Sequence, residues 1–426
     1  MRRDGRSARH VAKLSHVTRT DSAQLLEHLY RDTITALHPG RAVRDALDRT
    51  FTLDTTLGGA LHIIALGKAA APMASAALEW CVAQHFSVKG GVCVTHDEPA
   101  NGLAPLHVCI GDHPTPSTRS AAAAAALGGY IASHVDQGDR VLVLLSGGTS
   151  SLIGAPLDGS DHAEYLATTR ALVASGLDIN QINAQRRQLS RWGGGRLGAA
   201  LQARGATVTV LLISDVIGDD LASIGSGPCI PERGDTAQPI THHVIADNHV
   251  ARDTVVRLAR ERGMIAQAID EPLLGDVDCC AERIALVLLT HASAARHGSV
   301  RHKPRLICWG GEPTVPVPID APPGGRMQAL ALTVARRLHD AGDAAIRLTL
   351  LAAGTDGRDG ATNAAGAIVD SRTWAAIRDL ARSPERDLAT MRSHDALAAV
   401  GALIPAFTSG TNVNDLVIGL VLGDDF

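Results

Sequence analysis

The chain has 426 residues, of which 45% are hydrophobic, 20% are charged and 3% are aromatic. This length exceeds that of one average core, so we expect two domains filled mainly by Val, Leu, Ile and Ala. The formal net charge of −4 argues against nucleic acid or an anionic membrane as the main partner, and no apolar run approaches the ~20 residues that span a bilayer.

Residues 1–20 carry six basic side chains against one acid and lack the apolar stretch of a secretory signal. We therefore expect a disordered basic extension and a cytoplasmic protein. The seven cysteines show no C-x-x-C spacing, which favours buried free thiols in a reducing cytosol over a metal site or a disulfide framework.

After a helix expected over 22–37, buried strands alternate with helices as far as residue 262. Each strand is a short run rich in β-branched residues and Leu. This alternation is typical of a doubly wound, mostly parallel sheet, and it predicts a Rossmann-like α/β domain over 21–262. The expected strands are His62–Leu66, Gly91–Thr95, Leu106–Ile110, Val141–Leu145, Val208–Ile213 and His243–Ala246.

The stretch 263–303 is interpreted as a helical bridge, after which strands and helices resume. We expect a second, smaller α/β domain over 304–426, with a helix at Met327–Leu338. The proline-rich run 313–325 is expected to be a loop beside a functional segment rather than a linker. The strands expected in this domain are Leu306–Trp309, Arg347–Leu351, Ala367–Val369 and Val417–Leu422.

Glycine-rich turns at strand ends are the main functional signal. One contains Gly67-Lys68, and another is Ser146-Gly147-Gly148-Thr149-Ser150. At the carboxyl ends of strands in an open α/β sheet, such turns bring backbone N–H groups close to an anion. Lys68 directs its ammonium over a helix N-terminus, where a phosphate or carboxylate binds favourably, although a solvated lysine is the alternative.

A further glycine-rich turn, Gly193-Gly194-Gly195, follows the polar residues Asn183 and Arg186. With Gly198 its spacing formally fits a dinucleotide pattern, but the preceding segment is helix-like and polar rather than a strand. We therefore reject a nicotinamide site here. Phosphate binding and a flexible surface loop are equal interpretations of this turn.

Carboxylates also follow a buried strand, at Asp215 and Asp219. Acids so close in sequence repel one another unless a cation or hydrogen-bond donors compensate them, so Asp215 is a candidate Mg²⁺ ligand. Asp356 lies in a second acidic turn, which lacks the EF-hand pattern. His113 follows a strand end, and the histidines show no zinc-binding spacing.

Arg326 is expected at the N-terminus of the second domain's helix, where its positive charge opposes the helix dipole. This local disadvantage indicates an anionic partner, either a ligand or a neighbouring acidic side chain.

Taken together, the motifs resemble those of the class II glycerate 2-kinases, which carry a C-terminal MOFRL domain and are often labelled hydroxypyruvate reductases. The similarity extends from about Asp21 to Leu420. The motifs that carry it are LGKAAAPMA (Leu66–Ala74), DHPTP (Asp112–Pro116), LLSGGTSSL (Leu144–Leu152), INAQRRQLSRWGGGRL (Ile182–Leu197), ISDVIGDDLASIGSGP (Ile213–Pro228), GGEPTV (Gly310–Val315), AAGTDGRDGATNAAGAIVD (Ala352–Asp370) and GTNVNDL (Gly410–Leu416).

The resemblance implies ATP- and Mg²⁺-dependent phosphorylation of D-glycerate to 2-phosphoglycerate, in a cleft between two α/β domains. It places the family's functional lysine at Lys68 and its functional arginine at Arg326. On this basis we expect nucleotide phosphates at Ser146, Gly147, Gly148, Thr149, Ser150, Gly194 and Gly195, substrate at His113, Asn183 and Arg186, and Mg²⁺ at Asp215, Asp219 and Asp356.

The chain departs from the family pattern at Gly193, Met327, Ala329 and Gly354, which replace a lysine, an amide and two acids. An NAD(P)H-dependent hydroxypyruvate reductase is the first alternative, but it requires a strand-linked dinucleotide fingerprint that the sequence lacks. A non-catalytic sensor of nucleotides or sugar acids is the second. Nothing in the sequence decides the oligomeric state, and a homodimer is left open.

Overall fold

The computed structural model describes residues 19–50, 59–175, 179–218, 221–230, 240–296, 303–318 and 320–423. The chain divides into two compact units, each described here by itself. The parallel-sheet unit comprises residues 36–250 and 410–413, and the mixed-sheet unit comprises 1–35, 251–409 and 414–426. Most of the basic extension predicted over 1–20 lies outside the described residues.

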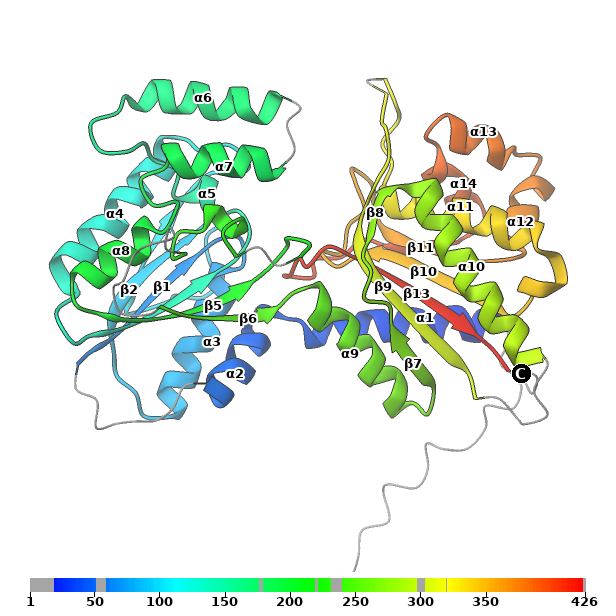
Figure 1. Ribbon diagram of the computed structural model, residues 1–426, viewed down its shortest axis with the longest axis horizontal. Coiled ribbons are helices and arrows are strands. Elements are labelled where there is room, and N and C mark those ends of the chain that lie inside the picture. Colours follow the sequence, from blue (N-terminus) through cyan, green and yellow to red (C-terminus); the bar gives the residue numbers. More distant parts are fainter. Residues whose placement is uncertain are drawn as a thin grey trace, which may run out of the picture. The chain divides into compact units, whose positions relative to one another are not determined.

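The parallel-sheet unit contains a six-stranded sheet in the order β3-β2-β1-β4-β5-β6, with every neighbouring pair parallel (Figure 1). This confirms the predicted doubly wound sheet. The strand order reverses between β1 and β4, which are direct neighbours. Its strands are β1 (Leu61–Leu66), β2 (Val88–Thr95), β3 (Leu106–Ile110), β4 (Arg140–Leu145), β5 (Thr207–Ile213) and β6 (Thr241–Ala246).

Helices cover both faces of this sheet because its strands are apolar on both sides. Ile64 and Leu66 of β1 pack with residues of α4 and α8 in one buried cluster. Since side chains alternate along a strand, Ile63 and Ala65 face the other side, where α3 packs on β1 and β2. The helices of this unit are α2 (Pro39–Thr50), α3 (Ala70–Ala83), α4 (Thr118–His134), α5 (Thr149–Leu152), α6 (His162–Ala174), α7 (Ile179–Leu189), α8 (Arg196–Ala203) and the 3₁₀ turn Ile224–Ser226. Helix α9 (Asn248–Glu261) begins in this unit, but its residues from Ala251 onward belong to the mixed-sheet unit.

The mixed-sheet unit has strands in the order β12-β11-β10-β13-β9-β7, with β8 also paired to β9. The pairs from β12 to β9 are antiparallel, whereas β7 and β8 run parallel to β9. Its strands are β7 (Ile265–Ala268), β8 (Leu273–Asp276), β9 (Arg305–Thr314), β10 (Leu348–Gly354), β11 (Ala364–Asp370), β12 (Leu403–Pro405) and β13 (Asp415–Val421). Its helices are α1 (Arg19–Ala36), α10 (Val277–Arg296), α11 (Arg326–Asp340), the 3₁₀ turn Gly342–Ala345, α12 (Thr373–Asp379), α13 (Pro384–Ala389) and α14 (Ser393–Ala399).

The compact units do not follow the domain boundaries expected from the sequence. The segment expected to be a helical bridge, 263–303, contributes β7, β8 and α10 to the mixed-sheet unit. Its strands are four residues each and partly exposed, so they carry little apolar pattern. Helix α1 also belongs to this unit, where the Tyr30 hydroxyl donates to the Gly354 carbonyl over 2.5 Å.

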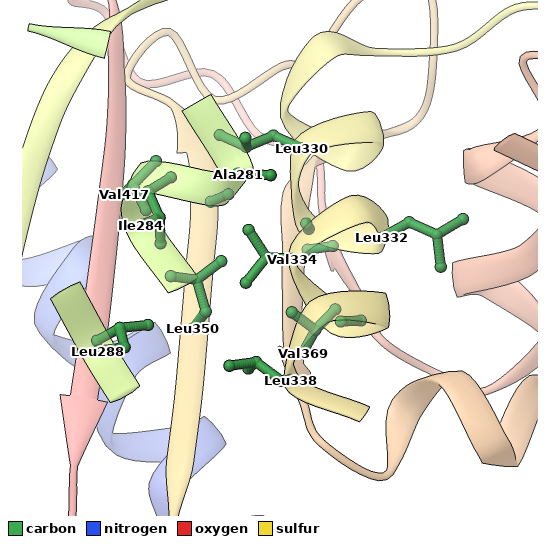
Figure 2. Packing of buried hydrophobic residues seen from close by; sticks show 14 of the residues in the cluster. Ala281, Ile284, Leu288, Leu330, Leu332, Val334, Leu338, Leu350, Val369 and Val417 are labelled. Atoms are coloured by element: carbon green, nitrogen blue, oxygen red, sulfur yellow. The ribbon is translucent and has the colours of Figure 1, made fainter. Parts of the chain in front are cut away.

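The core of the mixed-sheet unit lies between the sheet and the pair of helices α10 and α11 (Figure 2). Ile284 and Leu288 of α10 face Val334 and Leu338 of α11 across Leu350 of β10. Figure 2 also shows Leu332 pointing away from this group, and α11 contacts α12 and α14 in the same unit. Helix α11 is therefore buried on two sides, which fixes the position of its first residue, Arg326.

The seven cysteines are free and five of them are buried, in line with the expected unpaired thiols. None of the helices in the described part of the chain is both long and apolar enough to cross a membrane.

We expect Leu350→Ala to destabilise the protein by about 2–5 kcal/mol, because Leu350 is fully buried and its truncation leaves a cavity. Urea unfolding followed by circular dichroism measures the change. Leu380→Ala is the control, since that side chain is 57% exposed and its loss should be nearly neutral. Equal effects of the two substitutions would contradict the described core.

Candidate functional site

The turns after β1 and β4 are bonded directly to each other. The Lys68 N–H donates to the Gly147 carbonyl over 3.0 Å, and the Ala69 N–H donates to Ser146 Oγ, also over 3.0 Å. In open α/β sheets, ligands bind beside the strand ends where the strand order reverses. The structure therefore brings two of the predicted strand-end turns together at the position where such folds hold their ligands.

Glycine is required at three positions of these two turns. A Cβ on Gly67, whose φ is +121°, would lie 2.2 Å from Ser146 Oγ. A Cβ on Gly148 would lie 3.0 Å from Lys68 Cγ and 3.1 Å from His113 Cδ2, and one on Gly147 would lie 2.4 Å from Asp215 Oδ2. Three predicted site residues, Lys68, His113 and Asp215, thus surround the Gly147-Gly148 turn.

Backbone amides are the groups that this turn offers to a ligand. The N–H groups of residues 147–150 donate to no acceptor among the described residues. The hydroxyls are largely used internally: Thr149 Oγ1 donates to the Ser146 carbonyl over 2.8 Å, and Ser150 Oγ lies 2.9 Å from Ser226 Oγ. Successive open amides form a concave anion-binding surface, so the turn suits phosphate oxygens.

Two cations, Lys68 and Arg186, act on the His113 ring beside this turn. Lys68 is exposed, and neither Lys68 nor Arg186 forms an ion pair with any described acid. Arg186 Nε is buried and has no hydrogen-bond partner within the described ranges. The pKa of His113 is lowered to about 4, first by desolvation of the ring and then by the positive charges of Lys68, His96 and Arg186. The ring is therefore neutral at pH 7, while the two cations favour an anionic ligand.

The Gly194–Gly195 turn does not offer amides to a ligand, which corrects the phosphate-binding role expected for it. The N–H of Gly194 donates to the Ser226 carbonyl over 2.9 Å, and that of Gly195 donates to the Gly227 carbonyl over 2.8 Å. Asn183 Nδ2 likewise donates to the Ser223 carbonyl over 3.2 Å. These groups hold the neighbouring 222–227 segment in place.

Arg326 is the first residue of α11, as predicted from the sequence. Its Nε donates to Asp415 Oδ2 over 2.6 Å, and its Nη1 donates to Glu312 Oε1 over 2.8 Å. Two acidic side chains are thus the anionic partners indicated by its place at a helix N-terminus. Glu312 lies within β9, although the sequence placed it beside a loop.

The two carboxylates of the acidic turn after β10, Asp356 and Asp359, lie in different environments. Asp359 is buried and accepts hydrogen bonds from the Met327 and Gln328 N–H groups, so it caps α11. Asp356 is exposed, and its Oδ1 accepts a hydrogen bond from the Arg358 N–H over 3.0 Å. Only Asp356 is therefore accessible to a cation.

No group of three or more His, Cys, Asp or Glu side chains in the described part of the chain could hold a metal ion. Asp215 lies at the glycine turn, Asp356 belongs to the other unit, and Asp219 lies outside the described residues. Mg²⁺ in phosphate-transfer sites takes one or two carboxylates and completes its shell with phosphates and water. Asp215 beside open amides fits the single-carboxylate form of such a site.

Sequence reasoning did not assign a role to Glu312, Asn414 or Asp415. The motifs that contain them, GGEPTV and GTNVNDL, were noticeable as polar runs, but nothing in them shows that they meet at Arg326. That meeting depends on the pairing of β9 with β13, where Asp415 lies opposite Gly311. Lys68 and Arg326 belong to different units, and their action on one substrate stays a prediction.

The fold is a doubly wound α/β sheet, and its β1 and β4 turns place a lysine beside open backbone amides. A family model described as "Domain of unknown function (DUF4147)" matches residues 25–259, and the model of the MOFRL family matches 305–415. This chain therefore has the two-part architecture that its motifs led us to expect.

Several proteins that carry a named activity are similar to this chain over most of its length. The chain is 32% identical to a D-glycerate 2-kinase of Thermotoga maritima, over 94% of this chain and 98% of that protein. It is 31% identical to a putative hydroxypyruvate reductase of Agrobacterium vitis, over 84% of this chain and 98% of that one. A crystal structure of glycerate kinase from Thermotoga maritima matches with a TM-score of 0.82 and 31% identity, covering 95% of this chain and all of that chain. The chain belongs to the glycerate 2-kinase family.

We expect Lys68→Met to raise the pKa of His113 from about 4 toward, but not fully to, its ordinary value. Removing the ammonium removes a charge that disfavours the imidazolium, whereas the desolvation of the ring remains. NMR titration of the imidazole measures the shift. Lys89→Met, at the start of β2, is the control and should leave the His113 titration unchanged. An unaltered pKa in Lys68→Met would contradict the placement of these two side chains.

Proposed function

We propose that the protein transfers the terminal phosphoryl group of ATP to the 2-hydroxyl of D-glycerate. The supporting observation is the exposed Lys68 beside the open amides of residues 147–150, in a chain that belongs to the glycerate 2-kinase family. Phosphoryl transfer requires positioning and charge stabilisation more than covalent chemistry, and such a turn supplies both.

In this proposal Lys68 stabilises the negative charge of the transferring phosphoryl group. The amides of the Gly147-Gly148 turn hold nucleotide phosphate oxygens, and Asp215 contributes a carboxylate to the Mg²⁺ that accompanies them. Bound Mg²⁺ would neutralise phosphate charge during transfer. Gly194 and Gly195 are left out of this assignment because their amides are already bonded.

The acceptor would bind through groups that recognise a hydroxyl and a carboxylate. A neutral His113 accepts a hydrogen bond from a substrate hydroxyl, and Arg186, whose Nε has no partner among the described residues, attracts a negatively charged oxygen. Arg326 is assigned to the glycerate carboxylate, because a guanidinium fits a carboxylate well. Asn183 contributes by holding the segment at Ser223 rather than by donating to substrate.

A hydroxypyruvate reductase is the competing activity, since one relative carries that name. The turn after β1, the first turn of a Rossmann-like sheet, has a single glycine followed by Lys68 in place of the three-glycine fingerprint. A lysine side chain and a single glycine favour a phosphoryl group over a dinucleotide at this turn. No NADH oxidation is expected with hydroxypyruvate, and clear oxidation would favour the reductase.

We expect Lys68→Ala to lower ATP-dependent phosphorylation of D-glycerate by about 10²–10³-fold without unfolding the protein, by analogy with loss of one oxyanion-stabilising donor. A coupled ADP-release assay measures turnover, and circular dichroism checks the fold. Lys89→Ala is the matched control. Lys89 lies at the amino end of β2 near Asp136, whereas Lys68 follows the carboxyl end of the neighbouring parallel strand β1. Near-normal turnover of Lys68→Ala would refute the assigned role.

A further inference from the structure

Arg326 is held by two carboxylates from adjacent strands of one sheet. Glu312 lies on β9 and Asp415 starts β13, and these strands pair with Asp415 opposite Gly311. The two acids bind different nitrogens of the guanidinium, Nη1 and Nε. Because the guanidinium is planar, bonds at two of its nitrogens fix the direction of the third.

Nη2 of Arg326 is the nitrogen left for a ligand. It donates no hydrogen bond to any residue that the structure describes. The Arg326 side chain is 35% exposed, whereas Asp415 is 6% exposed. The ion pair of Arg326 and Asp415 is therefore anchored in the protein through Asp415 and reaches solvent through Arg326.

Glu312 and Asp415 together form a clamp on Arg326, and a second set of contacts holds this clamp in place. Asn414 Nδ2 donates to Glu312 Oε2 over 3.2 Å, so the outer carboxylate is fixed at both oxygens. The Asn414 backbone has a left-handed φ of +65°, and its carbonyl accepts bonds from the Thr355 N–H and hydroxyl. Strained backbone of this kind persists where surrounding contacts support it, and it often occurs at functional sites. Here consecutive side chains serve two partners, since Asn414 bonds to Glu312 and Asp415 bonds to Arg326.

A purely stabilising ion pair would not need this arrangement. One carboxylate satisfies one guanidinium charge, and here two carboxylates meet a single cation at a helix N-terminus. A second carboxylate beside Arg326 adds negative charge where an anionic ligand would bind. We therefore attribute its benefit to the orientation that it imposes on the Arg326 guanidinium. A freely rotating arginine loses side-chain entropy when it binds a ligand, whereas an arginine already held by two carboxylates has lost that entropy beforehand.

From this geometry we propose that Glu312 and Asp415 are positioning residues that hold Arg326 so that Nη2 meets the carboxylate of the acceptor substrate. The inference rests on the proposed function, and it extends that function to residues whose role is indirect. Asp415 and Glu312 do not touch the substrate in this account. Their effect is to fix the donor that does.

The test compares Asp415→Asn and Glu312→Gln with the wild-type protein. Both substitutions keep the shape of the side chain and remove its charge. We expect KM for D-glycerate to rise about tenfold in each variant, while kcat and KM for ATP change less than about twofold. The Arg326 Nε–H signal in a ¹H–¹⁵N spectrum should also shift in Asp415→Asn, which reports the clamp without activity.

Glu385→Gln is the control, because Glu385 pairs with Arg378 on the surface of the same unit. It should leave all three constants unchanged. If KM for D-glycerate is unaltered or falls in the clamp variants, the carboxylates merely neutralise Arg326 and the proposal is overturned. If the wild-type protein does not phosphorylate D-glycerate at all, the proposed function fails instead, and the two failures are distinct.

Discussion

The bonded contact between the β1 and β4 turns is the constraint on which the parallel-sheet site depends. Lys68 can lie beside open amides because Gly67 lets the β1 turn approach Ser146 of the β4 turn within hydrogen-bond distance, and because Gly148 leaves room for the lysine side chain. The reversal of strand order makes β1 and β4 neighbours, so their turns meet at one edge of the sheet. A side chain at Gly67 would collide with Ser146, and one at Gly148 would press on Lys68 and His113.

The two cations assigned to the reaction are supported in different ways. Lys68 has no described acidic partner, and an ammonium on a flexible stem acts as a mobile point charge. Arg326 is bound by Glu312 and Asp415 before any ligand arrives. We infer that Lys68 follows the phosphoryl group as it moves during transfer, whereas Arg326 holds the carboxylate of the acceptor, which stays in place.

Much of the parallel-sheet unit could be predicted from the sequence, because buried parallel strands are short apolar runs that end at glycine. The strands of the parallel sheet, Lys68 and the start of α11 at Arg326 followed from such local patterns. The amide partners of Gly194 and Gly195 did not, since glycine-rich turns look alike until the rest of the chain folds against them. The clamp on Arg326 and the placement of 263–303 likewise depend on strand pairing between distant segments.

The most direct test of the account is to identify the product that the wild-type protein makes from ATP, Mg²⁺ and D-glycerate. ³¹P NMR of the reaction mixture distinguishes a phosphate ester at the 2-hydroxyl from one at the 3-hydroxyl and from free phosphate. The account predicts 2-phosphoglycerate with one ADP released per ester formed. Formation of free phosphate alone, or no consumption of ATP with active-site residues intact, would contradict it.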